Sequence, residues 1–420
     1  MRLRKMSSAP EEAGQAKTAH KRRGNSKDMG NLRIALDPWV LAPRFRHQGT
    51  NVYARNLIAQ FRKAAAQIPE LEFVLFGPAQ GFEAELSEPS VNFSFVSNRL
   101  VQHERLWRLG GANVSARRIG TDVMFSPSCN VFPLRKPPVV CTIHDATPFV
   151  MPSQSRSMVL AQRFFLRSAA QRSRAIITVS ERSKEDLVEI CNIPPEKITV
   201  VYNGYDKTRF NEAPPDLDKL QALRLRLNLQ RPYILHHGVV QPRKNLVRLI
   251  EAYQLLLSPR SDLELDLVLA GPAGWEHGKV VQTAKRCSSK RGQVVIPGML
   301  ADDDLALLVK GAVMVVIPSL YEGFCLPMVE AMACGIPAAV SNNSCFPEIS
   351  GNALEYFDPQ SREDMAQKME SVLFDSELRE RIKARGLKRA GEFNWERCGH
   401  ETLGVLGKAV GRELSMEVFA

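Results

Sequence analysis

Short apolar runs alternate with amphipathic stretches along most of this chain. Runs of roughly four to eight apolar residues predict strands that are buried on both faces, and apolar spacing near 3.6 predicts helices between them. The predicted strands are residues 32–36, 72–76, 91–95, 122–125, 138–143, 175–179, 198–204, 233–237, 266–270, 294–300, 313–317 and 337–340. The predicted helices are residues 51–65, 100–109, 154–173, 182–189, 245–257, 303–308, 328–334, 362–374 and 377–390. This alternation is typical of α/β proteins with parallel sheets.

The length of 420 residues allows two such domains. Residues 207–231 are polar and contain Pro214 and Pro215, so this segment is the predicted linker. The first domain is then residues 31–206 and the second is residues 232–392. Residues 393–420 form a terminal segment with a predicted helix.

Composition places the chain among soluble globular proteins, with 44% hydrophobic and 24% charged residues. No apolar run approaches the roughly 20 residues that span a bilayer, and the N-terminus lacks the apolar core of a secretory signal. Residues 1–30 carry eight Lys/Arg and three Asp/Glu, a balance of 8 − 3 = +5, and few apolar residues. We expect them to be disordered.

The net charge of +11 limits the classes of partner that this protein is expected to bind. A basic protein can meet nucleic acid, an anionic membrane surface or an anionic acceptor. Basic residues interleaved with aromatics, as in single-stranded nucleic-acid sites, do not occur, so no nucleic-acid partner is predicted. The predicted helix over residues 100–109 is amphipathic, and lying on a membrane is an alternative to its plain interpretation as a surface helix.

Eight cysteines are scattered without the spacing of metal ligands. They are interpreted as reduced thiols of a cytoplasmic protein, and no metal site is predicted.

The most informative stretch is residues 313–335, which predicts a strand, a loop with Gly323, and a helix. Pro327 suits the first helical position and Gly335 suits the helix end. Such a turn aims free N–H groups and the positive end of a helix dipole at the crevice above the strand, where phosphates bind.

Two carboxylates, Glu322 and Glu330, flank this turn. Ionised carboxylates only accept hydrogen bonds, and sugar hydroxyls donate them. The sequence therefore predicts a nucleotide sugar rather than a bare nucleotide as the ligand.

A second strand–loop–helix unit follows the strand 233–237, with Gly238, Arg243 and Lys244 in its loop. Cations at a helix start oppose the helix dipole, which argues that an anion lies between them. His144 ends the strand 138–143, where a side chain faces the crevice. Gly49 precedes the predicted helix 51–65.

These segments together resemble one family. The pattern E-G-F-x-L-P-x-x-E-A-M-A-C-G-x-P from Glu322 resembles the E-x7-E signature of retaining GT-B glycosyltransferases of the glycosyl transferases group 1 family, which includes many bacterial mannosyltransferases. V-x-T-I-H-D-x-x-P around His144 and P-R-K-N at Pro242 match the same family. Near Gly49 the glycine and Tyr53 match, but the family's second glycine and arginine are absent. The resemblance covers roughly residues 32–405.

The resemblance implies an α/β GT-B fold, with two Rossmann-like domains facing a central cleft and the terminal helix returning to the first domain. It implies a retaining, metal-independent hexosyltransferase that uses a nucleotide-diphosphate sugar of mannose type, with no cofactor. The acceptor would be a saccharide or a lipid-diphosphate-linked saccharide in surface polysaccharide or lipopolysaccharide assembly, on a cytoplasmic protein that can associate with the membrane. The implied catalytic residues are Glu322, His144, Lys244 and Arg243. The implied donor-binding residues are Gly49, Gly238, Gly298, Met299, Gly323, Phe324, Cys325, Leu326 and Glu330.

Three alternatives stay open at this stage. A nucleotide-sugar epimerase of the same fold would use a donor without an acceptor. A non-catalytic binder would hold the nucleotide sugar without turnover, and a nucleic-acid-binding protein would account for the charge.

Overall fold

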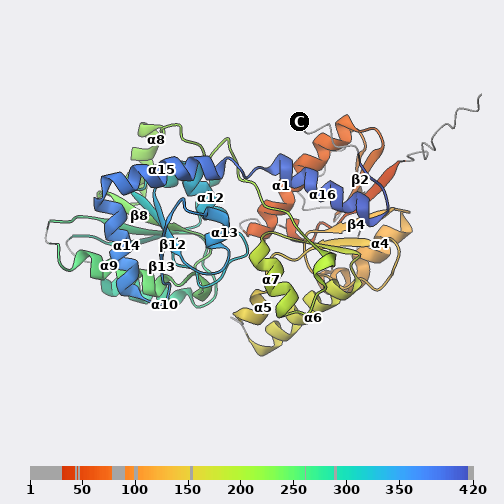
Figure 1. Ribbon diagram of the computed structural model, residues 1–420, viewed down its shortest axis with the longest axis horizontal. Helices are drawn as coiled ribbons and strands as arrows, with labels where there is room; N and C mark the ends of the chain where they lie inside the picture. Colours follow the sequence, from red (N-terminus) through yellow and green to blue (C-terminus); the bar gives the residue numbers. More distant parts are fainter. Residues whose placement is uncertain are drawn as a thin grey trace, which may run out of the picture.

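The computed structural model describes residues 31–414 apart from residues 43–44, 46–47, 78–89, 99–102, 152–154, 261 and 288–290. The segment 1–30, predicted to be disordered, lies outside the described residues. Figure 1 shows two lobes side by side, each a sheet covered by helices.

The first lobe is built on a seven-stranded parallel sheet in the order β3-β2-β1-β4-β5-β6-β7. Its strands are β1 Leu32–Leu36, β2 Leu71–Gly77, β3 Phe93–Ser97, β4 Val123–Ser126, β5 Val139–Thr142, β6 Ala175–Thr178 and β7 Ile198–Val200. Its helices are α1 Gly49–Gln67, α3 Glu104–Leu106, α4 Ala112–Arg118, α5 Thr147–Val150, α6 Arg156–Arg172 and α7 Glu181–Glu189.

The second lobe is built on a six-stranded parallel sheet in the order β10-β9-β8-β11-β12-β13. Its strands are β8 Tyr233–His237, β9 Asp266–Ala270, β10 Val294–Gly298, β11 Met314–Ile317, β12 Ala338–Ser341 and β13 Glu355–Phe357. Its helices are α8 Leu217–Arg226, α9 Leu246–Leu257, α10 His277–Cys287, α11 Asp302–Lys310, α12 Leu326–Ala333, α13 Phe346–Ser350, α14 Arg362–Phe374 and α15 Ser376–Ala390. The prediction of two Rossmann-like α/β domains is confirmed.

Strand order reverses once in each sheet, and these points position the site. In the second sheet the chain runs outward from β8 to β10 and then returns to add β11 on the other side of β8. Ligands of open parallel sheets bind at such a reversal, beyond the carboxyl ends of the strands. The loops after β8 and β11 therefore share one crevice.

Burial explains why the strands formed where the apolar runs lie. All the side chains of β8, β9 and β11 are buried, as expected for strands covered by helices on both faces. The predicted strands 32–36, 233–237 and 266–270 and the helix 362–374 agree with the structure residue for residue. Ser180 accepts a hydrogen bond from the Ser183 N–H and so begins α7 as predicted.

Two sequence expectations differ from the structure. Of the helix predicted over residues 100–109, residues 100–102 lie outside the described residues, and residues 104–109 are helical in the short α3 and a π-helical turn over Trp107–Gly111. The helix is not the regular α-helix expected, because Gly110, just beyond the predicted range, has φ 135°. Trp107 is buried, whereas Leu106 and Leu109 are 57% and 51% exposed. The predicted linker 207–231 contains α8, whose Leu223 joins the core of the second lobe.

The last helix, α16 Trp395–Ala409, lies on the first lobe beside α1, as Figure 1 shows. Trp395, Cys398, Leu403 and Leu406 belong to the buried core of that lobe. The chain therefore crosses between the lobes twice, once after β7 and once after α15.

The two crossings touch at Gly204. A Cβ placed on Gly204 would lie 2.2 Å from the Trp395 backbone nitrogen and 2.4 Å from the Asn394 carbonyl carbon. Real Cβ atoms do not make contacts this short. A side chain at Gly204 would therefore push apart the two backbone segments that connect the lobes.

We expect Gly204→Ala to lower the free energy of unfolding by about 1–3 kcal/mol, because backbone atoms have to move to make space. Urea titration followed by circular dichroism measures the loss. Gly278→Ala is the matched control, since a Cβ on this α10 residue meets nothing within 4 Å. Equal stability of the two variants would contradict the close approach.

Candidate active site

Two strand–turn–helix units meet at the reversal point of the second sheet. After β8 the chain forms a short 3-10 turn over Pro242–Lys244 and continues into α9. After β11 it forms the loop that leads into α12. The Leu320 N–H donates to the Arg243 carbonyl at 2.9 Å, so the two turns are joined through their backbones.

Glu322 lies between the two cations of the other turn. Its Oε1 is 2.6 Å from Lys244 Nζ and its Oε2 is 2.6 Å from an Arg243 guanidinium nitrogen. Glu322 is 7% exposed and Lys244 is 6% exposed. Burial alone would raise the pKa of Glu322, but Arg243 and Lys244 outweigh it and lower the pKa to about 2. The three side chains, of which Arg243 is 17% exposed, form one largely buried charged cluster, which we call the charge triad.

The sequence predicts an anion between Arg243 and Lys244. In the structure the Glu322 carboxylate occupies that place. Both cations keep unused donors. A guanidinium has five N–H groups and an ammonium has three, and each spends only part of them on Glu322 and, for Arg243, on the Tyr321 carbonyl. The charge triad has a net charge of about +1 with ionised Glu322, so it can still hold a further anion.

His144 brings the first lobe to this loop. Its Nε2 donates to the Pro127 carbonyl at 3.2 Å, and its ring meets the Tyr53 ring edge-on with centroids 4.8 Å apart. Burial lowers the pKa of His144, although Asp145 opposes the shift. A Cβ on Gly323 would lie 2.5 Å from the His144 carbonyl oxygen, so only glycine allows the loop to approach this closely.

Hydrogen bonds hold the two lobes together around the loop. Ser180 Oγ donates to the Gly323 carbonyl at 2.6 Å. The Tyr321 hydroxyl donates to Asp186 Oδ2 at 2.7 Å and accepts from the Ala146 N–H at 3.2 Å. The site loop of the second lobe is thus bonded directly to α7 and to the segment after β5.

Glu348 of α13 makes a second link between the lobes. Its carboxylate accepts from the backbone N–H groups of Glu181 and Arg182 at 2.7 and 2.9 Å. The Tyr202 hydroxyl donates to the same carboxylate at 2.9 Å. A carboxylate at a helix N-terminus accepts from free N–H donors and interacts favourably with the positive end of the helix dipole. Glu348 therefore caps α7 from the other lobe.

Glu330 lies in α12, one helical turn below the loop, and its surroundings differ from those of Glu322. Burial and then repulsion from Asp206 and Asp302 raise the pKa of Glu330 to about 8. The titratable side chain nearest its carboxylate is His237, at the end of β8, with Nε2 3.7 Å from Oε2. Burial and the neighbouring His236 and Lys244 lower the pKa of His237 to about 3, so its imidazole is neutral.

The predicted donor-binding glycines lie in different places. Gly238 follows β8 beside the Lys244 side chain, at 3.5 Å for a Cβ placed there. Gly298 lines a cavity of about 420 Å³ together with Val240, Gly271 and Ile296, beyond the carboxyl ends of β8, β9 and β10. Gly49 begins α1 and has open space around it.

The remaining predicted donor-binding residues are mostly packed rather than open. Phe324 is 4% exposed, and its ring meets the Phe393 ring edge-on at 5.4 Å. Cys325 is buried in the left-handed conformation with φ 68°, and burial raises the pKa of its thiol to about 12. Leu326 touches the cores of both lobes and starts α12, so Pro327 is its second residue rather than its first. Met299 is 55% exposed and does not line the cavity beside Gly298.

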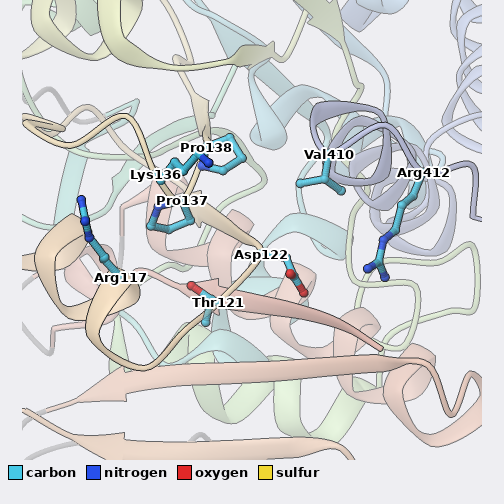
Figure 2. Close-up of a pocket in the computed structure, with 8 residues that line it drawn as sticks. All are labelled: Arg117, Thr121, Asp122, Lys136, Pro137, Pro138, Val410 and Arg412. Carbon is cyan, nitrogen blue, oxygen red and sulfur yellow. The ribbon is translucent and has the colours of Figure 1, made fainter. Parts of the chain in front are cut away.

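A second cavity, of about 430 Å³, lies in the first lobe, at the end of the sheet opposite the carboxyl ends of its strands. Figure 2 shows Thr121 and Asp122 before β4, Pro138 before β5, and Val410 and Arg412 after α16 around it. It is at the amino ends of β4 and β5, and none of the predicted site residues lines it. The crevice at the carboxyl ends remains the candidate active site.

Sequence reasoning missed several residues of this crevice. Tyr321, Ser180 and Asp186 have no motif of their own, because their contacts join distant segments. His237 had a signal, since it is a histidine at the carboxyl end of a strand, as His144 is. Among the described residues, no three His, Cys, Asp or Glu side chains are grouped as metal ligands are.

Two family models match the chain. The model described as Glycosyl transferases group 1 matches residues 221–389, which hold the charge triad and Glu330. The model described as Glycosyltransferase Family 4 matches residues 47–209, which hold His144.

The chain is 32% identical over 273 residues to the O-antigen chain mannosyltransferase B of Escherichia coli, which covers 64% of this chain and 70% of that protein. It is 28% identical over 264 residues to the serotype-specific mannosyltransferase WbdA of Escherichia coli, covering 62% of this chain and 32% of that larger protein. The crystal structure of Anabaena HepE in complex with UDP and glucose has a TM-score of 0.65 at 18% identity, covering 90% of this chain and 100% of that one.

We expect Glu322→Gln to lower the free energy of unfolding at neutral pH by about 3–5 kcal/mol, because two buried cations lose their carboxylate. The pKa of Glu322 is lowered in the folded state, so its stabilisation is complete above its ordinary value of 4.5 and is lost as the pH falls toward about 2. Urea titrations of the wild-type protein and of Glu322→Gln across this pH range should show that the difference between their free energies of unfolding decreases as the pH falls.

Glu370→Gln is the control for this prediction. Glu370 pairs with Arg260 at 2.6 Å, but the two side chains are 44% and 35% exposed. Removing a surface pair costs about 0–1 kcal/mol. A loss for Glu322→Gln no larger than that of Glu370→Gln would contradict the buried charge triad.

Proposed function

We propose that this chain, which belongs to the glycosyl transferases group 1 family, transfers a hexose of mannose type from a nucleotide-diphosphate sugar to a saccharide or lipid-linked acceptor. The likeness to O-antigen mannosyltransferases supports assembly of a surface polysaccharide as the setting. The observation that carries the proposal is the charge triad at the reversal point of the second sheet.

The diphosphate is the leaving group, and negative charge grows on it as the glycosidic bond breaks. Lys244 and Arg243 donate to its oxygens with the N–H groups that Glu322 leaves unused, and the N–H groups at the start of α12 add to them. Donors fixed in a water-poor site are worth about 3–4 kcal/mol each in a transition state. This electrostatic stabilisation does not require a metal, so we propose metal-independent transfer.

Glu322 has two tasks in this proposal. In the ground state it fixes the Lys244 and Arg243 side chains, whose rotamer freedom would otherwise have to be lost when the donor binds. During transfer it faces the sugar, where it accepts hydroxyl protons and stabilises the cationic ring. Retention at the anomeric carbon comes from the family resemblance, not from a distance.

The other parts of the donor have places in the same lobe. The cavity beside Gly298 and Val240 has a volume of about 420 Å³, which is large enough for a nucleobase. Its walls are mostly apolar, and His277 and Lys285 are its two polar side chains. Glu330, in α12 of the same lobe, accepts hydrogen bonds from the ribose hydroxyls in this proposal.

The first lobe supplies the acceptor side. His144 lies against the loop of the charge triad, and the Ser180, Tyr321 and Glu348 bonds hold the lobes together around it. Closed lobes exclude water, which limits hydrolysis of the donor. An epimerase would release the donor sugar without an acceptor, and a non-catalytic binder would show no turnover, so an acceptor-dependent assay separates all three.

We expect Lys244→Ala to lower kcat/KM by about 10²–10³-fold, since it removes one preorganised donor from the leaving group. The assay follows release of GDP or UDP from a panel of nucleotide sugars, after thermal shifts have shown which donor binds. Turnover should persist in EDTA, and the NMR spectrum of the product should show the anomeric configuration of the donor.

Lys279→Ala is the matched control, because Lys279 forms an exposed ion pair with Glu276 on α10. It should leave kcat/KM within about threefold of wild type, as expected for a surface pair. A Lys244→Ala enzyme with the rate of the control would refute the assignment of this crevice.

Membrane contact is a separate part of the proposal. No helix among the described residues is long and apolar enough to cross a bilayer. Leu160 and Phe164 lie one helical turn apart on the exposed face of α6 and are 65% and 55% exposed. The same helix has four arginines and no acidic residue. Apolar side chains among arginines suit the surface of an anionic membrane, on which a lipid-linked acceptor would lie.

We expect the double change Leu160→Ser and Phe164→Ser to reduce binding to vesicles of anionic phosphatidylglycerol by about tenfold or more, because two apolar anchors are lost. Co-sedimentation measures the bound fraction. Leu225→Ser on α8 is the control, since Leu225 is 70% exposed in the other lobe. Wild-type protein that ignores these vesicles, or a double variant that binds as well as wild type, would contradict the membrane surface.

A further inference from the structure

One buried histidine of the crevice has a ring nitrogen without a hydrogen-bond partner. His237, the last residue of β8, is 3% exposed, and its Nε2 has no partner in the described structure. The ring also approaches the Pro327 carbonyl in the first turn of α12, which can only accept and so favours a proton on the other ring nitrogen. With the proton there, Nε2 carries a lone pair, and it lies 3.7 Å from Glu330 Oε2.

Among the described residues, no Lys or Arg forms an ion pair with Glu330, and its side chain is 15% exposed. Burial, and then repulsion from Asp206 and Asp302, raise the pKa of its carboxyl to about 8. Burial, and then His236 and Lys244, lower the pKa of the His237 imidazole to about 3. At neutral pH the pair is thus a protonated carboxyl beside a neutral imidazole acceptor, and both are neutral.

We infer that His237 is a positioning residue for donor recognition: its Nε2 accepts a hydrogen bond from the Glu330 carboxyl O–H, so that the other Glu330 oxygen faces the ribose hydroxyls as a hydrogen-bond acceptor. The inference rests on the proposed function, in which Glu330 binds the ribose. The present separation is about 0.8 Å longer than a hydrogen bond, and rotation about the soft terminal torsion of Glu330 can close it.

This arrangement resolves an electrostatic conflict at the site. An ionised Glu330 would accept well from the ribose, but it would be largely shielded from water without a cation beside it and would repel the diphosphate of the same ligand. A protonated Glu330 without His237 would have its O–H free to turn toward the ribose and compete with the hydroxyl donors. When its O–H donates to His237, the carboxyl stays neutral and its other oxygen recognises hydroxyls.

The test uses the dissociation constants of GDP and UDP and of their 2′,3′-dideoxy analogues, measured by calorimetry on the whole chain. The ratio between ribose and dideoxyribose forms isolates the ribose contact from the diphosphate contact. We expect wild type to prefer the ribose form by about tenfold, the loss of roughly one good hydrogen bond. His237→Phe should reduce the preference to about threefold or less, while His237→Gln, whose amide oxygen can accept the same proton, should keep it.

Glu330→Gln separates the protonated from the ionised state of Glu330. Its amide copies a protonated carboxyl, with NH₂ toward His237 and the oxygen toward the ribose, so the variant should keep the ribose preference. Combined with His237→Phe it should lose the preference. Circular dichroism and thermal melting establish that each variant is folded.

Two results would overturn the inference alone. In the first, Glu330→Gln loses the ribose preference while His237→Phe keeps it, which would mean that Glu330 acts as an ionised carboxylate without His237. In the second, His237→Phe weakens the ribose and dideoxy forms equally, which would mean a structural role only. Wild-type protein that binds neither GDP nor UDP would overturn the proposed function and this inference with it.

Discussion

The structure of this site depends on the pairing of Glu322 with Arg243 and Lys244. Two cations and one carboxylate are buried together, each about 2.6 Å from its partner. Any one of them alone would be costly to bury, and the pairing of all three makes the cluster possible. The cluster also fixes the fold locally, because its members come from the two turns that flank the reversal point of the sheet. A charged group in the core of a domain is thus tolerated where it serves the crevice.

The same loop determines how the two lobes meet. Tyr321, Glu322 and Gly323 are consecutive, and each has a different partner: Asp186 of the first lobe, the cations of the second, and Ser180 with His144 of the first. A movement of one lobe relative to the other must therefore strain or break bonds to the residues on both sides of Glu322. The position of the Glu322 carboxylate and the approach of the first lobe are mechanically coupled through three residues of backbone.

Much of this could be predicted from the sequence, and the reasons are physical. Runs such as Tyr233–His237 are apolar enough to be buried on both faces, and Ser180 and Gly335 mark helix ends through local chemistry. The fold class and the residues of the two turns followed from these signals. The partners of those residues did not, because Glu322 is 78 positions from Lys244 and Glu348 is 167 positions from Glu181. The apolar spacing of residues 100–109 did not reveal the π-helical turn over Trp107–Gly111, where Gly110 has φ 135°.

The two acidic residues of the E-x7-E pattern illustrate why a motif does not determine chemistry by itself. Glu322 is buried, and Glu330, eight residues further on, has a side chain only 15% exposed. Two cations nevertheless lower the pKa of Glu322 to about 2, whereas burial raises that of Glu330 to about 8. The difference comes from β8 and the turn after it, which place Lys244 and Arg243 beside the first and a neutral histidine beside the second. In the proposed function these two charge states fit the two sugars of the donor, since the transferred sugar ring becomes cationic and the ribose does not. The side chains at the end of β8 and in the turn after it therefore decide which of the two glutamates is charged.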